Sequence, residues 1–506
     1  MIVRLLSLPS GRRYFSKILT PLLHASRNDA VEAVYRIVTR SNSAQNLKES
    51  LKSSGFFLSN DLVDEVLKRF KIGHGNPSQA LEFFKFAAAR KGFSHSASAL
   101  DTLLYVLGRN REFDHIWDVL IETKCKDPSL ITPKTVQVVL GRVAKVCSVE
   151  VTVECFRSLK EFIPVFDTFC FNALLSALCT EKSFEDAMNA YSSMRNEFMP
   201  NVQTFNVLLS GGKSSEYVES LFEEMKELGV TPNVVSYNCL IGLYCKRREM
   251  DKARNVVDRM RKEGVFPDVI TYTNIIVGLG LAGEPDKSRD VLKEMEANGC
   301  SPDVAAYNAA IKSYCVANRL HDAYSLMDEM VKKGMSPNAT TYNMFFRVFH
   351  YSSDWQASWS LYRRMLDAGC FPNTQSCMFL VRLCKKHEKV EMALKLWNDM
   401  IEKGFGSYIP VSDVLFDWLC DIDKVAEVEK CFLQMVEKGY KPSYESFRRI
   451  KVISHSQLIV AQNRFLNDDI SRQQLTVLNP MILLTDAFAP GLEGYSLRNN
   501  VLQRKL

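Results

Sequence analysis

Apolar residues recur along the chain in paired stripes, and each pair occupies about 35 residues. In the repeat that starts at Val234, one stripe runs through 240–245 and the second through 253–260. Spacings of three and four residues within each stripe predict two amphipathic helices. Gly264 follows the second stripe and Pro267 comes three residues later, a combination that ends a helix. Each repeat is therefore predicted to be a helical hairpin.

The repeat can be followed through most of the chain. Regular repeats begin at Thr168, Val202, Val234, Val269, Val304, Ala339, Thr374 and Ile409, and divergent ones begin at about Asp61, Ala97 and Pro133. Four consecutive repeats, from Val234 to Asn373, are each 35 residues long. A single hairpin cannot bury its apolar faces alone, whereas stacked copies can. We therefore predict an all-α fold, an α-solenoid (superhelix) of about eleven stacked 35-residue hairpins with a long inner surface.

The segments outside the repeats differ in composition. Residues 1–30 carry five basic side chains and no acidic one before Asp29, which is typical of an organellar transit peptide. A basic leader on a cytosolic protein is the alternative. Because the run from Arg13 to Ser16 resembles a mitochondrial processing site, we expect the mitochondrion, with the chloroplast as the other organelle to consider.

The starts of the repeats and the composition of the segments outside them define the predicted domains. It is a transit peptide at 1–30, a helical leader at 31–60, three divergent repeats at 61–167, eight regular repeats at 168–443, and a C-terminal helical cap and tail at 444–506.

Composition and motifs argue against several classes of function. Charged residues make up 24% of the chain and hydrophobic ones 46%, as in ordinary helical proteins. No apolar run approaches the ~18 residues of a membrane helix, so no membrane partner is expected. The sequence has no phosphate loop, no Gly-x-Ser-x-Gly and no His-Glu-x-x-His, so we expect neither enzymatic activity nor a cofactor. A net charge of +6 permits a nucleic-acid partner without requiring one.

The fourteen cysteines contain no Cys-x-x-Cys pair. Several recur at or next to the twelfth place of their repeats: Cys179, Cys245, Cys315, Cys384 and Cys420. That place lies on the apolar side of the first helix, where cysteine behaves as a small hydrophobe. We therefore predict structural cysteines and no metal site.

The starts and ends of the repeats resemble the pentatricopeptide repeat family, specifically its pure-repeat class of plant organelles. Val-Val-Ser-Tyr-Asn-Cys-Leu-Ile at 234–241 and Ala-Arg-xxx-Asp-Arg-Met-Arg-Lys-Glu-Gly at 253–264 are similar to its consensus. The resemblance is strong over 168–443 and weak over 61–167. Tetratricopeptide repeats have a 34-residue period and a different set of characteristic positions.

The resemblance implies binding of single-stranded RNA, one base per repeat, read mainly by the fifth residue and the last. The pairs are Asn172 with Asn201, Asn206 with Asn233, Asn238 with Asp268, Thr273 with Asp303, Asn308 with Asn338, and Asn343 with Asn373. An ionised Asp only accepts hydrogen bonds and favours U or G, whereas Asn can also donate and suits C or A. At the fifth place Asn reaches a pyrimidine and Thr leaves room for a purine. With the N-terminal repeats at the 5′ end, as in the family, the predicted target is 5′-YYUGYY-3′.

Some repeats do not follow this scheme. The repeat at Val202 is three residues short and carries Gly211 and Gly212, which suggests a bulge or a skipped base. The last two pairs, Met378 with Tyr408 and Asp413 with Ser443, depart from the family's code, and Asp101 and Gln137 occupy the fifth place of divergent repeats.

The resemblance also assigns a base-flanking role to the second place, where Val235 and Ile270 offer apolar faces. At the fifth place, we expect Thr273 to lie at an exposed helix start.

Together these inferences predict a monomeric RNA-binding protein of an organelle. It would act in RNA processing, stability, splicing or translation, alone or with recruited RNA-processing proteins. The alternative is a protein-binding scaffold, because Asn before a helix is also a good N-cap and Asp or Asn is an ordinary turn residue.

Overall fold

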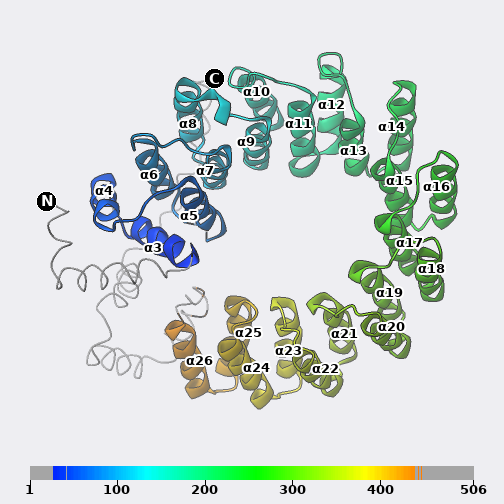
Figure 1. The fold of residues 1–506 in the computed structure, drawn as a ribbon. Coiled ribbons are helices and arrows are strands. Elements are labelled where there is room, and N and C mark those ends of the chain that lie inside the picture. The colour runs from blue at the N-terminus through cyan, green and yellow to red at the C-terminus, as the bar shows by residue number, and fades with distance from the viewer. Residues whose placement is uncertain (1–26, 42, 74, 439–442, 444–445, 447–506) are drawn as a thin grey trace, which may run out of the picture. The chain divides into compact units, whose positions relative to one another are not determined.

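The structure, a computed structural model, describes residues 27–41, 43–73, 75–438, 443 and 446. Within them it contains 24 α-helices, one short 3-10 helix and no β-strand, which confirms the predicted all-α repeat fold (Figure 1). The chain divides into two compact units, an N-terminal unit that ends at Pro302 and a C-terminal unit that begins at Asp303. Residues 1–26 of the predicted transit peptide, and all but Ser446 of the predicted tail, lie outside the described residues.

The N-terminal unit is a row of hairpins. Its helices are α3 (Arg27–Arg40), α4 (Ala44–Ser53), α5 (Asn60–Ile72), α6 (Pro77–Ala88), α7 (Ala97–Arg109), α8 (Phe113–Lys126), η1 (Pro128–Leu130), α9 (Pro133–Val146), α10 (Val149–Leu159), α11 (Thr168–Glu181), α12 (Phe184–Met194), α13 (Val202–Gly211), α14 (Ser215–Glu227), α15 (Val234–Lys246), α16 (Met250–Lys262), α17 (Val269–Ala282) and α18 (Pro285–Ala297).

The C-terminal unit continues the same pattern. Its helices are α19 (Val304–Val316), α20 (Leu320–Lys332), α21 (Ala339–Ser352), α22 (Trp355–Asp367), α23 (Thr374–Lys386), α24 (Val390–Lys403), α25 (Tyr408–Asp421) and α26 (Val425–Glu437). The eleven hairpins from α5 to α26 match the predicted repeats, and α3 with α4 forms one more in front of them. We call the first helix of each hairpin helix A and the second helix B.

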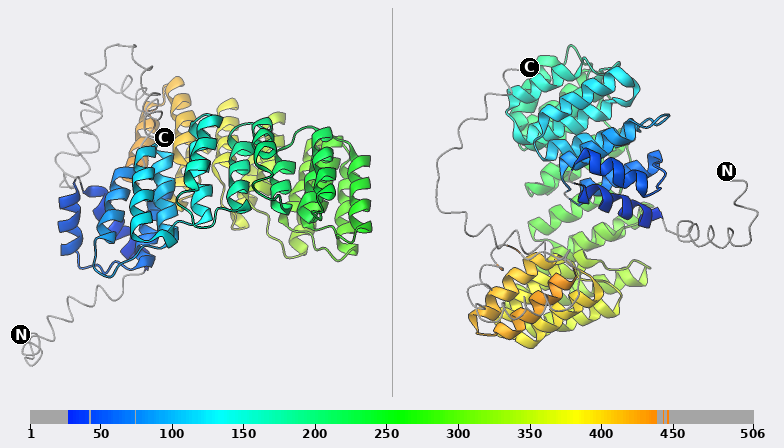
Figure 2. Two further views of the ribbon diagram at one scale, coloured as in Figure 1. Left: turned by 90° about the horizontal axis from the view of Figure 1, so that it is seen from above. Right: turned by 90° about the vertical axis from the view of Figure 1, so that its left-hand side faces the viewer.

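Consecutive helices A pack against one another within each unit (Figure 2). In the N-terminal unit α11, α13, α15 and α17 contact in turn, and in the C-terminal unit α19, α21, α23 and α25 do so. The core between helices A and B is made by the apolar places of the repeat. Tyr237 and Met260, which represent these places in one hairpin, are both fully buried.

The ends of helix B depend on a glycine whose backbone takes the left-handed conformation. Gly264 has φ +76°, and the Val265 N–H then donates to the Met260 carbonyl at 3.0 Å. This is the expected way to close a helix at glycine. The same arrangement ends α18 at Gly299 and α20 at Gly334, which explains why glycine recurs with the period.

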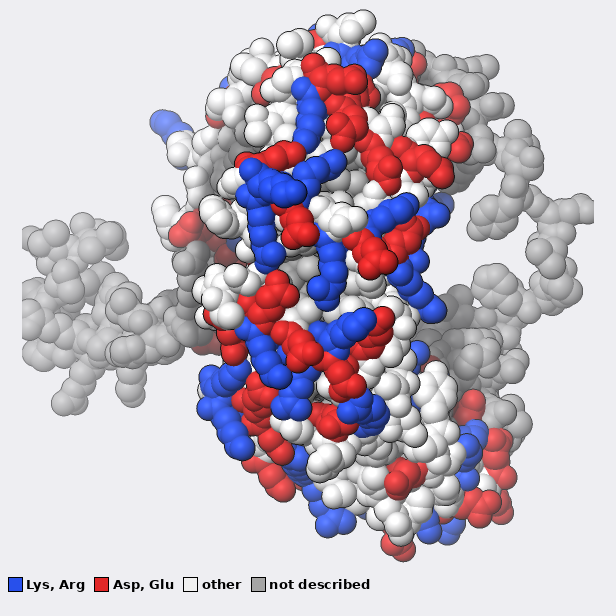
Figure 3. Space-filling view, turned by 90° about the vertical axis from the view of Figure 1, so that its right-hand side faces the viewer, with Lys and Arg blue, Asp and Glu red and all other residues white. Residues whose placement is uncertain are grey.

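The exposed side of the helices B carries both signs of charge (Figure 3). Ion pairs join neighbouring repeats there, such as Lys226 with Glu263 at 2.7 Å in the N-terminal unit and Arg364 with Asp328 at 2.7 Å in the C-terminal unit. Exposed pairs of this kind add little stability. Their importance here is that they neutralise basic side chains on this side of the repeats.

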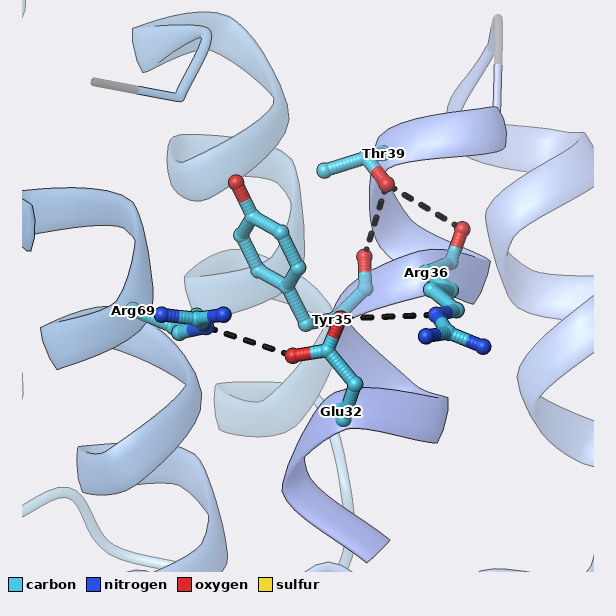
Figure 4. A network of polar contacts seen from close by, with 5 residues as sticks. All are labelled: Glu32, Tyr35, Arg36, Thr39 and Arg69. Carbon is cyan, nitrogen blue, oxygen red and sulfur yellow. Dashed lines mark hydrogen bonds and ion pairs between the residues drawn. The ribbon is translucent and has the colours of Figure 1, made fainter. Parts of the chain in front are cut away.

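The helical leader is joined to the first divergent repeat by a polar network (Figure 4). Glu32 on α3 accepts from Arg36 at 3.3 Å and from Arg69 on α5 at 3.2 Å. Beside it, Tyr35 packs edge-on against Phe70 with ring centroids 4.9 Å apart. Helix α3 begins at Arg27, so the end of the segment predicted as 1–30 is helical.

Candidate functional site

The last residues of the first six regular repeats are the N-caps of the helices A that follow, whereas Tyr408, which ends the seventh, is the first residue of α25 itself. Asp268 Oδ1 accepts from the Thr271 N–H at 2.8 Å, and the Asp268 N–H donates to Thr271 Oγ1 at 3.1 Å. This reciprocal capping box recurs at Asn201, Asn233, Asn338 and Asn373. Asp303 caps α19 without the reciprocal bond, because Ala306 stands where the other repeats have Ser or Thr. The capping role allowed by the alternative interpretation is thus present in the fold.

Most predicted pairs are in direct contact. The fifth Asn donates from Nδ2 to Oδ1 of the last residue in four pairs: Asn172 to Asn201 at 3.2 Å, Asn206 to Asn233 at 3.3 Å, Asn238 to Asp268 at 3.0 Å, and Asn343 to Asn373 at 3.1 Å. Both members of the Asn308 and Asn338 pair are described, and no hydrogen bond joins them. The remaining pair is divided between the units, with Thr273 in the N-terminal unit and Asp303 in the C-terminal unit.

The fifth residues are more buried than a residue at an exposed helix start. Asn238 and Asn343 are 8% and 5% exposed. Thr273 is half-buried, which corrects the expectation that it is exposed, and its hydroxyl donates to the Val269 carbonyl of its own helix at 2.7 Å. At Asn238 and Asn343, only a narrow edge of the side chain can therefore meet a ligand.

A hydroxyl from the next repeat holds the fifth amide, and the sequence analysis missed this contact. Oγ of the residue at the third place donates to Oδ1 of the preceding fifth Asn in four cases: Ser236 to Asn206 at 2.6 Å, Thr271 to Asn238 at 2.6 Å, Thr341 to Asn308 at 2.7 Å, and Ser376 to Asn343 at 2.6 Å. These four hydroxyl residues are fully buried. Thr135 makes the same contact with Asp101 in the divergent repeats, at 2.8 Å.

The sequence contained a signal for this hydroxyl. The third place holds Ser or Thr after each of the regular repeats that have Asn at the fifth place, and it holds Ala306 after the repeat that has Thr273. One repeat differs in geometry. Thr204 Oγ1 lies 3.2 Å from Asn201 Oδ1, and Asn172 Oδ1 is buried without a hydrogen-bond partner.

These contacts determine the orientation of the side chains. Burial tends to raise the pKa of Asp268, but hydrogen bonds from Thr271 and Asn238 outweigh it and hold that pKa below its ordinary value. Asp268 is therefore an ionised acceptor at neutral pH, and Asn238 must turn Nδ2 toward it. The Asn238 oxygen then faces the Thr271 hydroxyl, as observed.

The repeat at Val202 keeps its pair despite its missing residues. Helix α13 ends at Gly211 after 10 residues, while α15 and α17 have 13 and 14. A Cβ atom on Gly211 would lie 2.8 Å from Cys179 Sγ, so glycine permits this close approach of the two helices A. The deletion shortens helix A, and the Asn206 to Asn233 contact remains.

The second place of helix A is exposed beside the fifth. Val235 is 51% exposed and Ile270 is 58% exposed. Phe169, which the sequence analysis did not single out, occupies the same place in α11 and is 44% exposed. Second and fifth places lie on one face of a helix, so these apolar side chains adjoin the paired polar ones.

Two kinds of reactive group bear on catalysis, metal ligands and nucleophilic thiols. The described residues contain no group of three or more His, Cys, Asp and Glu side chains that could hold a metal ion. Burial raises the pKa of the Cys245 and Cys315 thiols to about 12, so neither is a ready nucleophile. No helix in this part of the chain is long and apolar enough to cross a bilayer.

The repeats match known proteins. The PPR repeat family model matches residues 167–212, 232–281, 267–315 and 302–350, the pentatricopeptide repeat domain model matches 212–247, and the PPR repeat model matches 376–405. Among solved structures, the chain is similar to the pentatricopeptide repeat protein PPR10 from maize, with 16% identity, 93% of this chain and 82% of that chain covered, and a TM-score of 0.34.

Curated relatives come from Arabidopsis thaliana. The chain is 28% identical over 216 residues to a mitochondrial pentatricopeptide repeat-containing protein, At5g15010. The aligned region covers 42% of this chain and 37% of that protein. It is 68% identical over 426 residues to the pentatricopeptide repeat-containing protein At1g02420, with 84% of this chain and 87% of that protein covered. Identity of this degree over most of both proteins shows that the chain belongs to the pentatricopeptide repeat family.

Proposed function

We propose that the chain is a sequence-selective RNA-binding protein of an organelle that binds a single strand with one base per repeat. The observation that carries this proposal is the recurring contact between the fifth and last residues. Each such pair has one internal hydrogen bond and leaves further polar atoms for a ligand. A residue that only capped the next helix would not need a buried Asn side chain, five places into its own repeat, to hydrogen-bond to it.

The cap selects the atom that a base meets. Asp268 uses Oδ1 for Thr271 and Asn238, so its second oxygen is left as an acceptor. Asn373 likewise uses Oδ1 for Ser376 and Asn343, which leaves its NH₂ as a donor. U and G carry a ring N–H that suits an acceptor, and C and A carry a bare ring nitrogen that suits a donor. This is the chemical basis for the target 5′-YYUGYY-3′.

The cellular role extends this proposal. Occupancy of a stretch of single strand excludes nucleases and competing hairpins, so the protein needs no catalysis of its own to act in RNA stability, processing, splicing or translation. The mitochondrial relative and the basic segment 1–30 support the mitochondrion as its location. A protein-binding scaffold is the second candidate, since the caps stabilise the helices without any ligand.

Binding of the purified full chain to a short RNA that contains YYUGYY tests the proposal. We expect a preference of roughly tenfold or more over an RNA with the central UG changed to CA, because a good base-edge pair is worth ~1–3 kcal/mol. Titration at a stated salt concentration measures this preference. Equal weak binding of both RNAs would indicate contact through charge alone, and no binding would favour the scaffold.

Phe169 should contribute stacking at the first base of the target. An aromatic ring beneath a base is worth on the order of 1–3 kcal/mol, so Phe169→Ala is expected to weaken binding by roughly fivefold to a hundredfold. Phe57, which is 82% exposed and lies outside the repeats, provides the matched control as Phe57→Ala. Equal affinities for the two variants would contradict the stacking role.

A further inference from the structure

Three of the four helices A of the C-terminal unit carry an unpaired basic side chain at the ninth place, and the fourth, α25, has Asp417 there. Lys312 on α19, Arg347 on α21 and Arg382 on α23 occupy this place in three consecutive repeats and are exposed. None of the three has an ion pair among the described residues. This contrasts with the helices B, where Arg364 is held by Asp328.

The ninth place lies on the same face as the paired polar residues. Lys312 and Arg347 line a hollow of about 910 Å³ together with Thr340, Asn343 and Gln375. The ninth residue is one turn beyond the fifth, roughly 6 Å along the helix axis at 1.5 Å per residue. A strand whose base meets Asn343 therefore has its sugar and phosphate within reach of the neighbouring basic groups.

No acidic group on these helices offsets the charge. Helices α19, α21 and α23 contain no Asp or Glu. The pKa of His350 on α21 is lowered first by burial and then by the positive charges of Arg382 and Lys386 on α23. The positive charge of α23 therefore acts on the neighbouring helix α21.

The N-terminal unit is different at the corresponding places. Its regular repeats have uncharged residues at the ninth place: Ser176, Ser210, Gly242 and Val277. Its second places offer Phe169, Val235 and Ile270, with Gln203 in the short repeat, whereas those of α19, α21 and α23 are Ala305, Thr340 and Gln375. At the second place, apolar side chains are therefore found mainly in the N-terminal unit, and at the ninth place basic side chains occur only in the C-terminal one among the regular repeats.

We propose that Lys312, Arg347 and Arg382 form a phosphate track that binds the ribose-phosphate backbone of the RNA along the C-terminal unit. Guanidinium and ammonium groups bind phosphate oxygens through charge-assisted hydrogen bonds. The inference rests on the proposed RNA-binding function. It adds that the two units bind in different ways, through stacking in the first and through salt-sensitive backbone contacts in the second.

The test compares two triple variants of the full chain. One is Lys312→Gln, Arg347→Gln and Arg382→Gln. The control is Lys332→Gln, Arg363→Gln and Lys395→Gln, which removes the same charge from exposed residues on the helices B of the same repeats. Affinity for the YYUGYY RNA is titrated at several KCl concentrations, and circular dichroism checks that both variants are folded.

The track predicts a change in salt dependence. Each lost phosphate contact reduces the slope of log K against log salt by about 0.7 for a single strand, so the first variant should lose about 2 from the slope and the control almost nothing. Preference for UG over CA should persist in both. Equal slopes in the two variants would overturn the track while leaving RNA recognition intact. Failure of the unaltered chain to bind any RNA would overturn the proposed function and the track with it.

Discussion

Replacing Asp268 with asparagine is expected to move the preference at one base from U to C. The cap needs only one side-chain oxygen, and Asn caps a helix as well as Asp does. The introduced asparagine would therefore keep its Oδ1 on Thr271 and Asn238, as Asn373 does in its own repeat, and would place an NH₂ donor where the second carboxylate oxygen now lies. A base-edge pair is worth ~1–3 kcal/mol, so we expect a change in the U over C ratio of roughly tenfold or more. Titration with RNAs that differ at this one base measures it.

Stability provides the control for this substitution. Asp268→Asn should leave the melting temperature nearly unchanged, whereas Asp268→Ala removes the cap and should cost ~1 kcal/mol. If Asp268→Asn destabilises the chain as much as Asp268→Ala and leaves base preference unchanged, the residue is only a cap.

The ionisation of Asp268 also makes its U preference insensitive to mild acid. The folded pKa lies below the unfolded one, so this group stabilises the fold above the unfolded pKa and that contribution is lost as the pH falls through the folded pKa. Preference for U should therefore be the same from about pH 8 to about pH 5.

The period alone was sufficient to predict the fold because each repeat buries the same places. Tyr237 and Met260 are buried as the apolar stripes require, and Gly264 takes the left-handed conformation that the helix end requires. The paired residues were named by the resemblance to the family, and the packing of helices A brings four of the six pairs into direct contact. The shortness of α13 agrees with the three residues missing from its repeat, but the close approach of Gly211 to Cys179 was not visible in the sequence, because Cys179 lies in another repeat.

The hydrogen bonds within the site were harder to predict. Thr204 and Thr271 occupy the same place in the sequence, yet Thr271 Oγ1 lies within hydrogen-bond distance of both the last residue and the fifth, whereas Thr204 Oγ1 reaches only the last residue, Asn201. A hydroxyl can rotate to either oxygen, and the choice depends on how neighbouring helices approach each other. The burial of Asn238 depends on the same approach, which a single repeat does not specify.

Thr271→Val should reduce both stability and base discrimination, because it removes a buried hydroxyl while keeping the shape of the side chain. Asn238 Oδ1 would then be buried without a partner, at a cost of ~1–3 kcal/mol, and the Asp268 N–H would lose its acceptor. The amide would turn toward water to recover a hydrogen bond, so the base would no longer meet a fixed donor. We expect a lower melting temperature and a U over C ratio several-fold smaller, on the order of the loss of one base-edge contact.

Two further variants separate positioning of the amide from capping. Thr271→Ser keeps the hydroxyl, as Ser236 and Ser376 do in their repeats, and should restore both properties. Thr204→Val removes the capping contact with Asn201 but takes no partner from Asn172, whose Oδ1 already lacks one, so it should cost less stability than Thr271→Val. If Thr271→Val and Thr204→Val lose the same stability and Thr271→Val keeps its U preference, the third-place hydroxyl serves the helix start and has no part in base selection.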